Sequence, residues 1–161
     1  MMQHLSDWLA ATWLSQRFAR SNWFVPAVQS VHILAIALVL ALLFTLHLRL
    51  LGVTRGGPPP PRLAAGYLPW VWRGLGVLLI TGVLLTITEP ARELLDICFR
   101  VKMLLVLTLV ALTGVLQAGW RRSPDYWSAS RRRRHLGGAV AIGSLLLCVC
   151  IVVAGRLIAY V

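Results

Sequence analysis

Four long apolar runs dominate this sequence and constrain its fold more than any other feature. They extend over residues 24–51, 68–87, 101–120 and 136–160. Each run is long enough to cross a hydrocarbon core of about 30 Å, which requires roughly 20 helical residues. Because unpaired backbone groups are too unfavourable in lipid for other structures of this length, we expect an all-α fold with four transmembrane helices in a single membrane domain, residues 1–161.

The composition agrees with this prediction. Only 13% of the residues are charged and 58% are hydrophobic, whereas soluble domains hold about 25% charged residues. The 16 Lys and Arg residues exceed the 5 Asp and Glu residues, which gives a net charge of +11. These basic residues lie mainly at the ends of the apolar runs, where they orient helices and contact anionic lipid. We therefore expect a lipid bilayer with anionic lipids as the partner, and no nucleic acid.

Residues 1–21 precede the first apolar run and have the pattern of an amphipathic helix. Trp8 and Trp13 share one face of such a helix, and Ser6 is placed to cap it. Tryptophans on one face favour a helix that lies in the plane of the membrane interface. We therefore predict an N-terminal interfacial helix rather than a frayed tail.

Basic residues are distributed unequally between the two sides of the predicted bundle. Ten of them lie in or beside the connections between the first and second runs and between the third and fourth runs, and six lie on the opposite side. The positive-inside rule places the ten-charge side in the cytoplasm. Both termini then face the periplasm of a bacterial inner membrane. The ten are Arg49, Arg55, Arg62, Arg73, Arg121, Arg122 and Arg131 to Arg134.

The two connections on that side are expected to be irregular. Residues 56–61 combine two glycines with four prolines, which predicts a stiff, extended connector that cannot continue a helix. Residues 121–135 form a basic loop with Tyr126 and Trp127 at the membrane edge. Its run of four arginines, Arg131, Arg132, Arg133 and Arg134, is predicted to bind anionic lipid.

Small residues are expected to hold the helices together. Burial of apolar surface does not drive association in lipid, so close backbone approach must contribute much of the packing. Gly74, Gly76 and Gly82 offer such sites on the second helix. Because every connection is short, the predicted product is an antiparallel four-helix bundle.

Histidines are the candidates for a cofactor site. His32 lies nine residues after Trp23, about 13 Å below the interface, where an ionisable group needs a partner or a task. Two interpretations fit His32: a hydrogen bond to a Ser or Thr of a neighbouring helix, or ligation of haem or a metal. His47 lies on the same helix face about 22 Å away, and His135 opens the fourth helix at a similar depth. We therefore consider His32, His47 and His135 as candidates for binding haem b or copper.

Lys102 and Arg156 lie near the outer ends of their helices. Their long side chains can extend to water, or they can bind an anionic group such as a lipid phosphate or a haem propionate. Glu89, Glu93 and Asp96 lie on the same side and could neutralise them instead. Both interpretations remain open at this stage.

Short motifs that are distributed over nearly the whole chain carry a resemblance. They are Ser21-Asn-Trp-Phe-Val-Pro26, Val31-His32-Ile-Leu-Ala35, Leu48-Arg49-Leu-Leu-Gly52, Leu68-Pro-Trp70, Phe99-Arg-Val-Lys102-Met-Leu104 and Gly155-Arg156-Leu-Ile-Ala-Tyr160. Together they resemble a family of small bacterial four-helix membrane proteins of unknown function. The section from Thr81 to the basic loop is similar to the copper-resistance protein D group, and the bundle resembles four-helix b-type cytochromes more loosely.

This resemblance implies an inner-membrane protein in which His32, Lys102 and Arg156 match motif positions of the family. The chain departs from the family pattern at two positions. It has His47 where an Asp is commoner, and Gln117 where a His often ends the third helix.

The sequence contains no phosphate-binding loop, nucleophile–base pair, paired catalytic carboxylates or zinc spacing. We therefore expect a non-catalytic accessory subunit that packs within a larger respiratory or photosynthetic electron-transfer assembly. The alternative is a redox or metal-handling protein that binds haem b or copper through His32. Copper passage is a weaker third interpretation, because Met103 is the only thioether in a membrane run and Cu(I) prefers soft ligands.

Overall fold

The computed structural model describes residues 23–54, 56–88 and 97–157. In this part of the chain every regular element is a helix, and each of the four helices is long and apolar enough to cross a membrane. The predicted all-helical, multi-pass architecture is thereby confirmed, whereas the helix predicted over residues 1–21 lies outside the described residues. The helices are α3 (Phe24–Leu50), α4 (Pro60–Thr88), α6 (Ile97–Arg122) and α7 (Arg131–Leu157).

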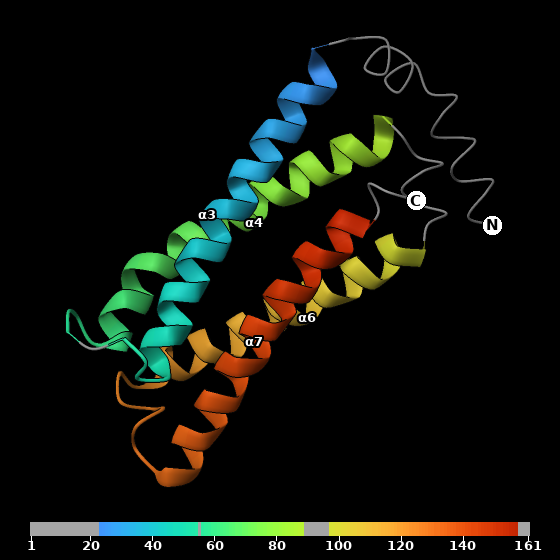
Figure 1. Cartoon of the computed structure of the whole chain (residues 1–161). Helices are drawn as coiled ribbons and strands as arrows, with labels where there is room; N and C mark the ends of the chain where they lie inside the picture. The colour runs from blue at the N-terminus through green and yellow to red at the C-terminus, as the bar shows by residue number, and fades with distance from the viewer. Residues whose placement is uncertain (1–22, 55, 89–96, 158–161) are drawn as a thin grey trace.

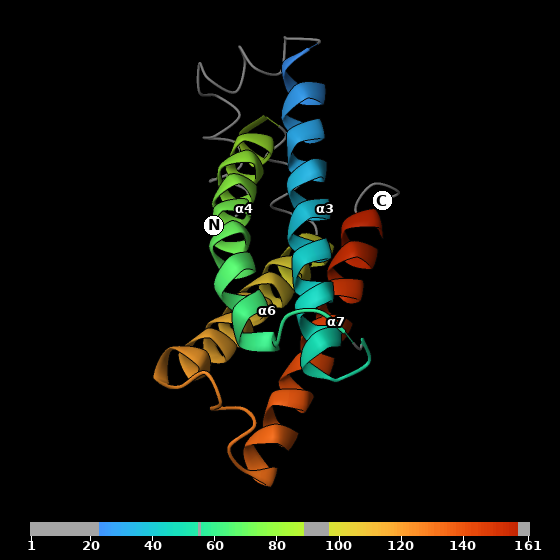
Figure 2. The ribbon, with the colours of Figure 1, turned by 90° about the vertical axis from the view of Figure 1, so that its left-hand side faces the viewer.

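The helices are arranged as two pairs. Helix α3 packs along α4, and α6 packs along α7 (Figure 1). The pairs meet where α3 contacts α7 and, over a shorter stretch, where α4 contacts α6. Figure 2 shows that the loop from α3 to α4 and the loop from α6 to α7 lie at the same end of the molecule, which we call the loop end.

Helix α4 begins eight residues before the predicted boundary at residue 68. The prediction that residues 56–61 form an extended connector is therefore wrong for Pro60 and Pro61, which form the first turn of α4. Proline is tolerated there because the first N–H groups of a helix have no partner within the helix. The carbonyl of Pro59 accepts the N–H groups of Arg62 and Leu63 and so closes the first turn.

Helix α7 also begins earlier than predicted, so that Arg131 to Arg134 belong to a helix and not to a loop. The Oγ of Ser130 accepts the backbone N–H of Arg133 at 3.2 Å, which is the hydrogen bond of a helix N-cap. The guanidinium of Arg133 also lies 4.4 Å from the ring centroid of Tyr126, within the range of a cation–π interaction. These contacts allow a helix to start within a run of positive charge.

Arg49 fixes the loop between α3 and α4. Its guanidinium donates hydrogen bonds to the carbonyls of Thr54 at 2.7 Å, Gly57 at 2.7 Å and Pro58 at 3.2 Å. Gly57 adopts a φ of +85°, in the left-handed region that glycine tolerates better than other residues. One side chain thus holds three carbonyls of this loop.

Trp127 fixes the loop between α6 and α7. Its side chain is only 8% exposed, so it packs inside the protein and does not face outward. The indole lies between the two helices, where Gly119 of α6 and Gly137 of α7 leave room for it. A Cβ at Gly119 would lie 2.6 Å from the ring. The indole Nε1–H donates to the carbonyl of Leu116 at 3.2 Å.

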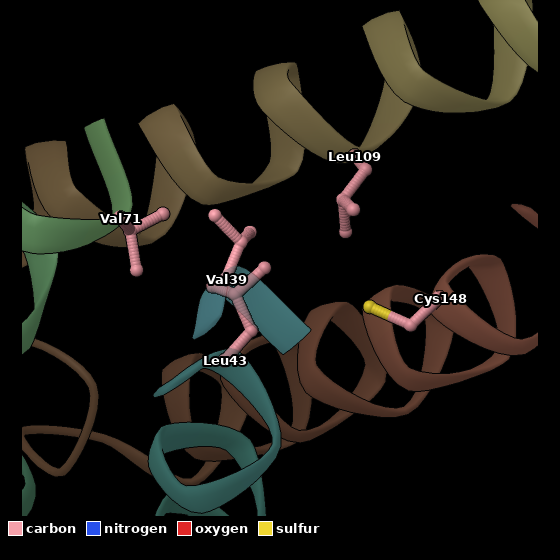
Figure 3. Packing of buried hydrophobic residues seen from close by; sticks show 5 residues of the cluster. All are labelled: Val39, Leu43, Val71, Leu109 and Cys148. Atoms are coloured by element: carbon pink, nitrogen blue, oxygen red, sulfur yellow. The ribbon is translucent and has the colours of Figure 1, made fainter. Parts of the chain in front are cut away.

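The apolar core lies where the four helices come together. Val39 and Leu43 of α3, Val71 of α4, Leu109 of α6 and Cys148 of α7 form this buried cluster (Figure 3). All four helices contribute to it, so the core joins the two pairs.

Gly74 permits the closest approach of α3 and α4. A Cβ at this position would lie 2.5 Å from a methyl group of Val39. Gly82 faces the ring of His32, because a Cβ at Gly82 would lie 3.7 Å from Cε1 of the imidazole. The prediction that Gly76 also supports packing is wrong, because no atom lies within 4 Å of the place where its side chain would begin.

Candidate functional site

The candidate site is a polar layer above the apolar core, on the side away from the loop end. Each helix contributes one residue to this layer, and that residue lies seven positions, or two turns, from a buried core residue of the same helix. The layer residue and the core residue therefore share one helix face and lie about 10 Å apart. We name His32, Thr81, Lys102 and Gly155 the polar layer. The corresponding positions at the core are Val39, Gly74, Leu109 and Cys148.

A hydrogen bond between α3 and α4 holds the imidazole of His32. Nδ1 of His32 lies 2.6 Å from Oγ1 of Thr81. The Thr81 hydroxyl also lies 2.7 Å from the carbonyl of Val77. When the hydroxyl donates its single proton to that carbonyl, Nδ1 is the donor toward Thr81. The other ring nitrogen, Nε2, then carries a lone pair. The predicted alternative in which His32 bonds to a Ser or Thr of a neighbouring helix is confirmed.

Lys102 supplies a positive charge to the same layer. Its side chain is half-buried, and a Cβ at Gly155 of α7 would lie 3.6 Å from its Nζ. Asp125, the one acidic residue in the described part of the chain, lies in the loop at the loop end. Lys102 therefore has no carboxylate partner among the described residues, and the predicted partners Glu89, Glu93 and Asp96 lie outside them.

The other two candidate histidines have different environments. His47 is fully buried, and its Nδ1–H donates to the carbonyl of Leu43 at 2.6 Å. Its Nε2 finds no hydrogen-bond partner among the described residues. His135 is exposed at the start of α7. The structure therefore does not bring His47 and His135 together in one buried site.

The remaining predicted positions are at the surface or outside the described side chains. Arg131 to Arg134 are all exposed at the loop end. Arg156 lies in α7, and its side chain is outside the described part. Gln117 accepts a hydrogen bond from Nε1 of Trp72 at 2.7 Å and thereby links α4 to α6.

A bare metal ion does not fit the described residues. Among them, no group of three or more His, Cys, Asp or Glu side chains could hold such an ion. A haem is different, because its iron needs only axial ligands from the protein and its propionates carry negative charge.

Sequence reasoning missed Thr81 and Gly155 as members of the site. Both could have been found from the seven-residue spacing, which separates Thr81 from Gly74 and Gly155 from Cys148. The spacing becomes informative only when it is compared across all four helices.

Comparisons with protein-family models, with curated proteins and with solved structures found no match. The function is therefore inferred from the fold and the site.

Proposed function

We propose that this chain is a non-catalytic integral membrane subunit that packs within a larger respiratory or photosynthetic electron-transfer assembly. The observation that carries this proposal is the breadth of its outward apolar surface. Between 17% and 28% of the most apolar window of each helix is buried inside the chain. Large apolar side chains such as Leu34, Leu79, Leu104 and Leu146 are more than 60% exposed, one on each helix. Such surfaces suit packing against the helices of neighbouring subunits.

We also propose that the four helices cross the bacterial inner membrane in alternating directions, with the loop end in the cytoplasm and both termini in the periplasm. Two observations support this orientation. The loops from α3 to α4 and from α6 to α7 lie at one end, and the exposed Arg131 to Arg134 lie at that end too. Basic residues of this kind remain on the cytoplasmic side and contact anionic lipid head groups.

The subunit proposal predicts a particle much larger than the chain itself. Gentle extraction of the tagged chain should yield a complex on a native gel that contains electron-transfer subunits identified by mass spectrometry. Deletion of the chain should lower the amount of that complex. Re-expression of the intact chain is the control and should restore it. A chain that migrates as a free monomer, with unchanged complexes in the deletion strain, would contradict the proposal.

A second candidate function is a redox role with haem b bound through His32. The observation that favours it is the half-buried His32, whose Nε2 offers a lone pair to a haem iron when Nδ1 donates to Thr81. Lys102 would pair with a propionate, and the haem would supply one-electron chemistry. Copper bound through His32, and copper passage, are weaker proposals, because no group of three or more metal-ligating side chains lies together among the described residues.

The haem proposal predicts the Soret band of a b-type haem in the purified chain. His32→Ala should abolish this band, because the iron loses its ligand. His135→Ala is the matched control and should leave the band unchanged. A purified chain without such a band, extracted from cells supplied with haem, would rule out the haem proposal, and elemental analysis of the same sample tests for copper.

A further inference from the structure

Two polar atoms in the interior of the protein have no hydrogen-bond partner among the described residues. They are Nε2 of His47 on α3 and Oγ of Ser144 on α7. Both side chains are 0% exposed. A polar atom that is buried without a hydrogen bond is unfavourable, so nearly all such atoms in proteins are paired. Because α3 and α7 contact each other, these two atoms indicate a partner that they share.

His47 and Ser144 lie at the same level of the contact between α3 and α7. Leu43 of α3 and Cys148 of α7 both belong to the buried core cluster (Figure 3). His47 comes four residues after Leu43, and Ser144 comes four residues before Cys148. Four helical residues cover about 6 Å and return to nearly the same helix face. Each polar side chain is therefore displaced from the core by the same distance, on the buried face of its helix.

A second contact shows that both displacements point toward the loop end. Leu51 directly follows α3, and a Cβ at Gly138, near the start of α7, would lie 3.8 Å from its Cδ2. His47 precedes Leu51 by four residues, about 6 Å, and Ser144 follows Gly138 by six residues, about 9 Å. His47 and Ser144 thus both lie between this contact and the core cluster, and their positions along the helices agree within about 3 Å.

The buried face of α7 is formed by small side chains, which leave room opposite the imidazole. In the described part of this helix the buried residues are Gly137, Ala141, Ser144 and Cys148. Trp127 covers Gly137, but the other three lie beyond that contact. Since His47 and Ser144 are both completely shielded from the surface, only a molecule of very few atoms fits between them.

The hydrogen-bonding roles of the two groups define this molecule. Nδ1 of His47 lies 2.6 Å from the carbonyl of Leu43. A carbonyl can only accept, so Nδ1 carries a proton, and Nε2 of the neutral ring is an acceptor. The hydroxyl of Ser144 both donates and accepts. The partner must therefore donate to the imidazole and also bond to a hydroxyl, without bringing a charge into the apolar interior.

We propose that one buried water molecule bridges Nε2 of His47 and Oγ of Ser144. It donates one hydrogen to Nε2 and accepts the hydroxyl hydrogen of Ser144. Two hydrogen bonds of about 2.8 Å span atoms up to about 5 Å apart, and two polar partners are the minimum that holds a buried water. This water joins the two helix pairs, since α3 belongs to one and α7 to the other. The site does not depend on the proposed role as an assembly subunit.

The proposal is tested on the full-length chain, labelled with ¹³C and ¹⁵N in histidine and reconstituted in phosphatidylcholine liposomes. In proton-detected solid-state NMR, magnetisation from water should reach the Nε2 side of the His47 ring although this side chain is fully buried. The loss of the signal in His47→Leu assigns it. Ser144→Ala should abolish the transfer, because the water loses one of its two partners. Thr45→Ala is the matched control, because it removes an exposed hydroxyl of α3 close to His47 in sequence, and it should leave the transfer unchanged.

A double-mutant cycle measures the link between the two side chains. His47→Leu, Ser144→Ala and the double variant are unfolded with denaturant in detergent. A shared water makes the two substitutions non-additive by roughly fivefold in the equilibrium constant of unfolding, the usual contribution of one hydrogen bond. Thr45→Ala combined with Ser144→Ala should be additive. If His47→Leu does not fold, the water transfer in Ser144→Ala still tests the site.

Three outcomes would overturn the proposal. The first is no transfer from water to His47 in the unaltered chain, which together with a non-additive cycle would indicate a direct hydrogen bond to Ser144. The second is an additive cycle, or a transfer that persists in Ser144→Ala. The third is a haem iron or a copper ion on Nε2 of His47, detected by absorption or elemental analysis and lost in His47→Leu. Each can occur whether or not the chain co-purifies with a larger assembly, so failure of this site and failure of the subunit proposal are distinguishable.

Discussion

Trp127→Ala is expected to lower the free energy of unfolding of this chain by about 3–5 kcal/mol, the typical loss when a buried large aromatic side chain is truncated. The indole fills the space between α6 and α7 over Gly119 and Gly137, and its Nε1–H satisfies the carbonyl of Leu116. Without it, the loop between these helices loses its attachment to the bundle. Unfolding of the detergent-solubilised chain, followed by circular dichroism during denaturant titration, measures the loss.

Two variants separate the packing of Trp127 from its hydrogen bond and from a general effect of tryptophan removal. Trp127→Phe keeps most of the ring but removes the Nε1–H, so it should lose only about 1 kcal/mol if the site accommodates the smaller ring. Trp23→Ala removes a tryptophan that is 85% exposed, and it should leave the stability nearly unchanged. If Trp127→Ala were no less stable than Trp23→Ala, the indole would not hold α6 and α7 together.

Gly74→Ala should destabilise the chain by about 1–3 kcal/mol, the usual effect of forcing extra volume into a packed site. The added methyl group would lie 2.5 Å from a methyl group of Val39, so α3 and α4 must separate or Val39 must change its rotamer. The same denaturant titration measures the effect.

The control for this substitution lies on the same helix. Gly76→Ala adds the same methyl group where no atom lies within 4 Å, so its stability should equal or slightly exceed that of the unaltered chain. Val39→Ala should partly rescue Gly74→Ala, because it removes the methyl group that clashes. Simple additivity of these two substitutions would show that Gly74 and Val39 do not contact each other in the folded protein.

The sequence predicts the number and the class of the helices because the apolar runs leave few alternatives in lipid. It predicts their boundaries less well. Helix α4 begins at Pro60 because proline is acceptable in a first turn, although the proline-rich run appeared to exclude a helix. Helix α7 begins at Arg131 because Ser130 caps it and Tyr126 stacks on Arg133. Positive charge alone is unfavourable at a helix N-terminus, so only the cap and the stacking explain this start.

The candidate site was predictable in part. The depth of His32 and the resemblance both singled out this residue, and its hydrogen bond to a hydroxyl was one of two predicted alternatives. The choice of Thr81 as partner depends on how α3 and α4 are aligned, which is set by the contact of Gly74 with Val39. The proximity of Lys102 to Gly155 depends on the alignment of α6 with α7 in the same way. Neither alignment can be read from one helix by itself.

One side chain fixes each of the two loops at the loop end: Arg49 holds the loop between α3 and α4, and Trp127 holds the loop between α6 and α7 against both helices. The polar layer is divided between the two helix pairs, since His32 and Thr81 belong to one and Lys102 and Gly155 to the other. A small rotation of one hairpin against its neighbour would therefore change the separation of imidazole and ammonium without breaking either hairpin. The distance between these two groups therefore responds to any force that a surrounding complex exerts on the contact between the two helix pairs.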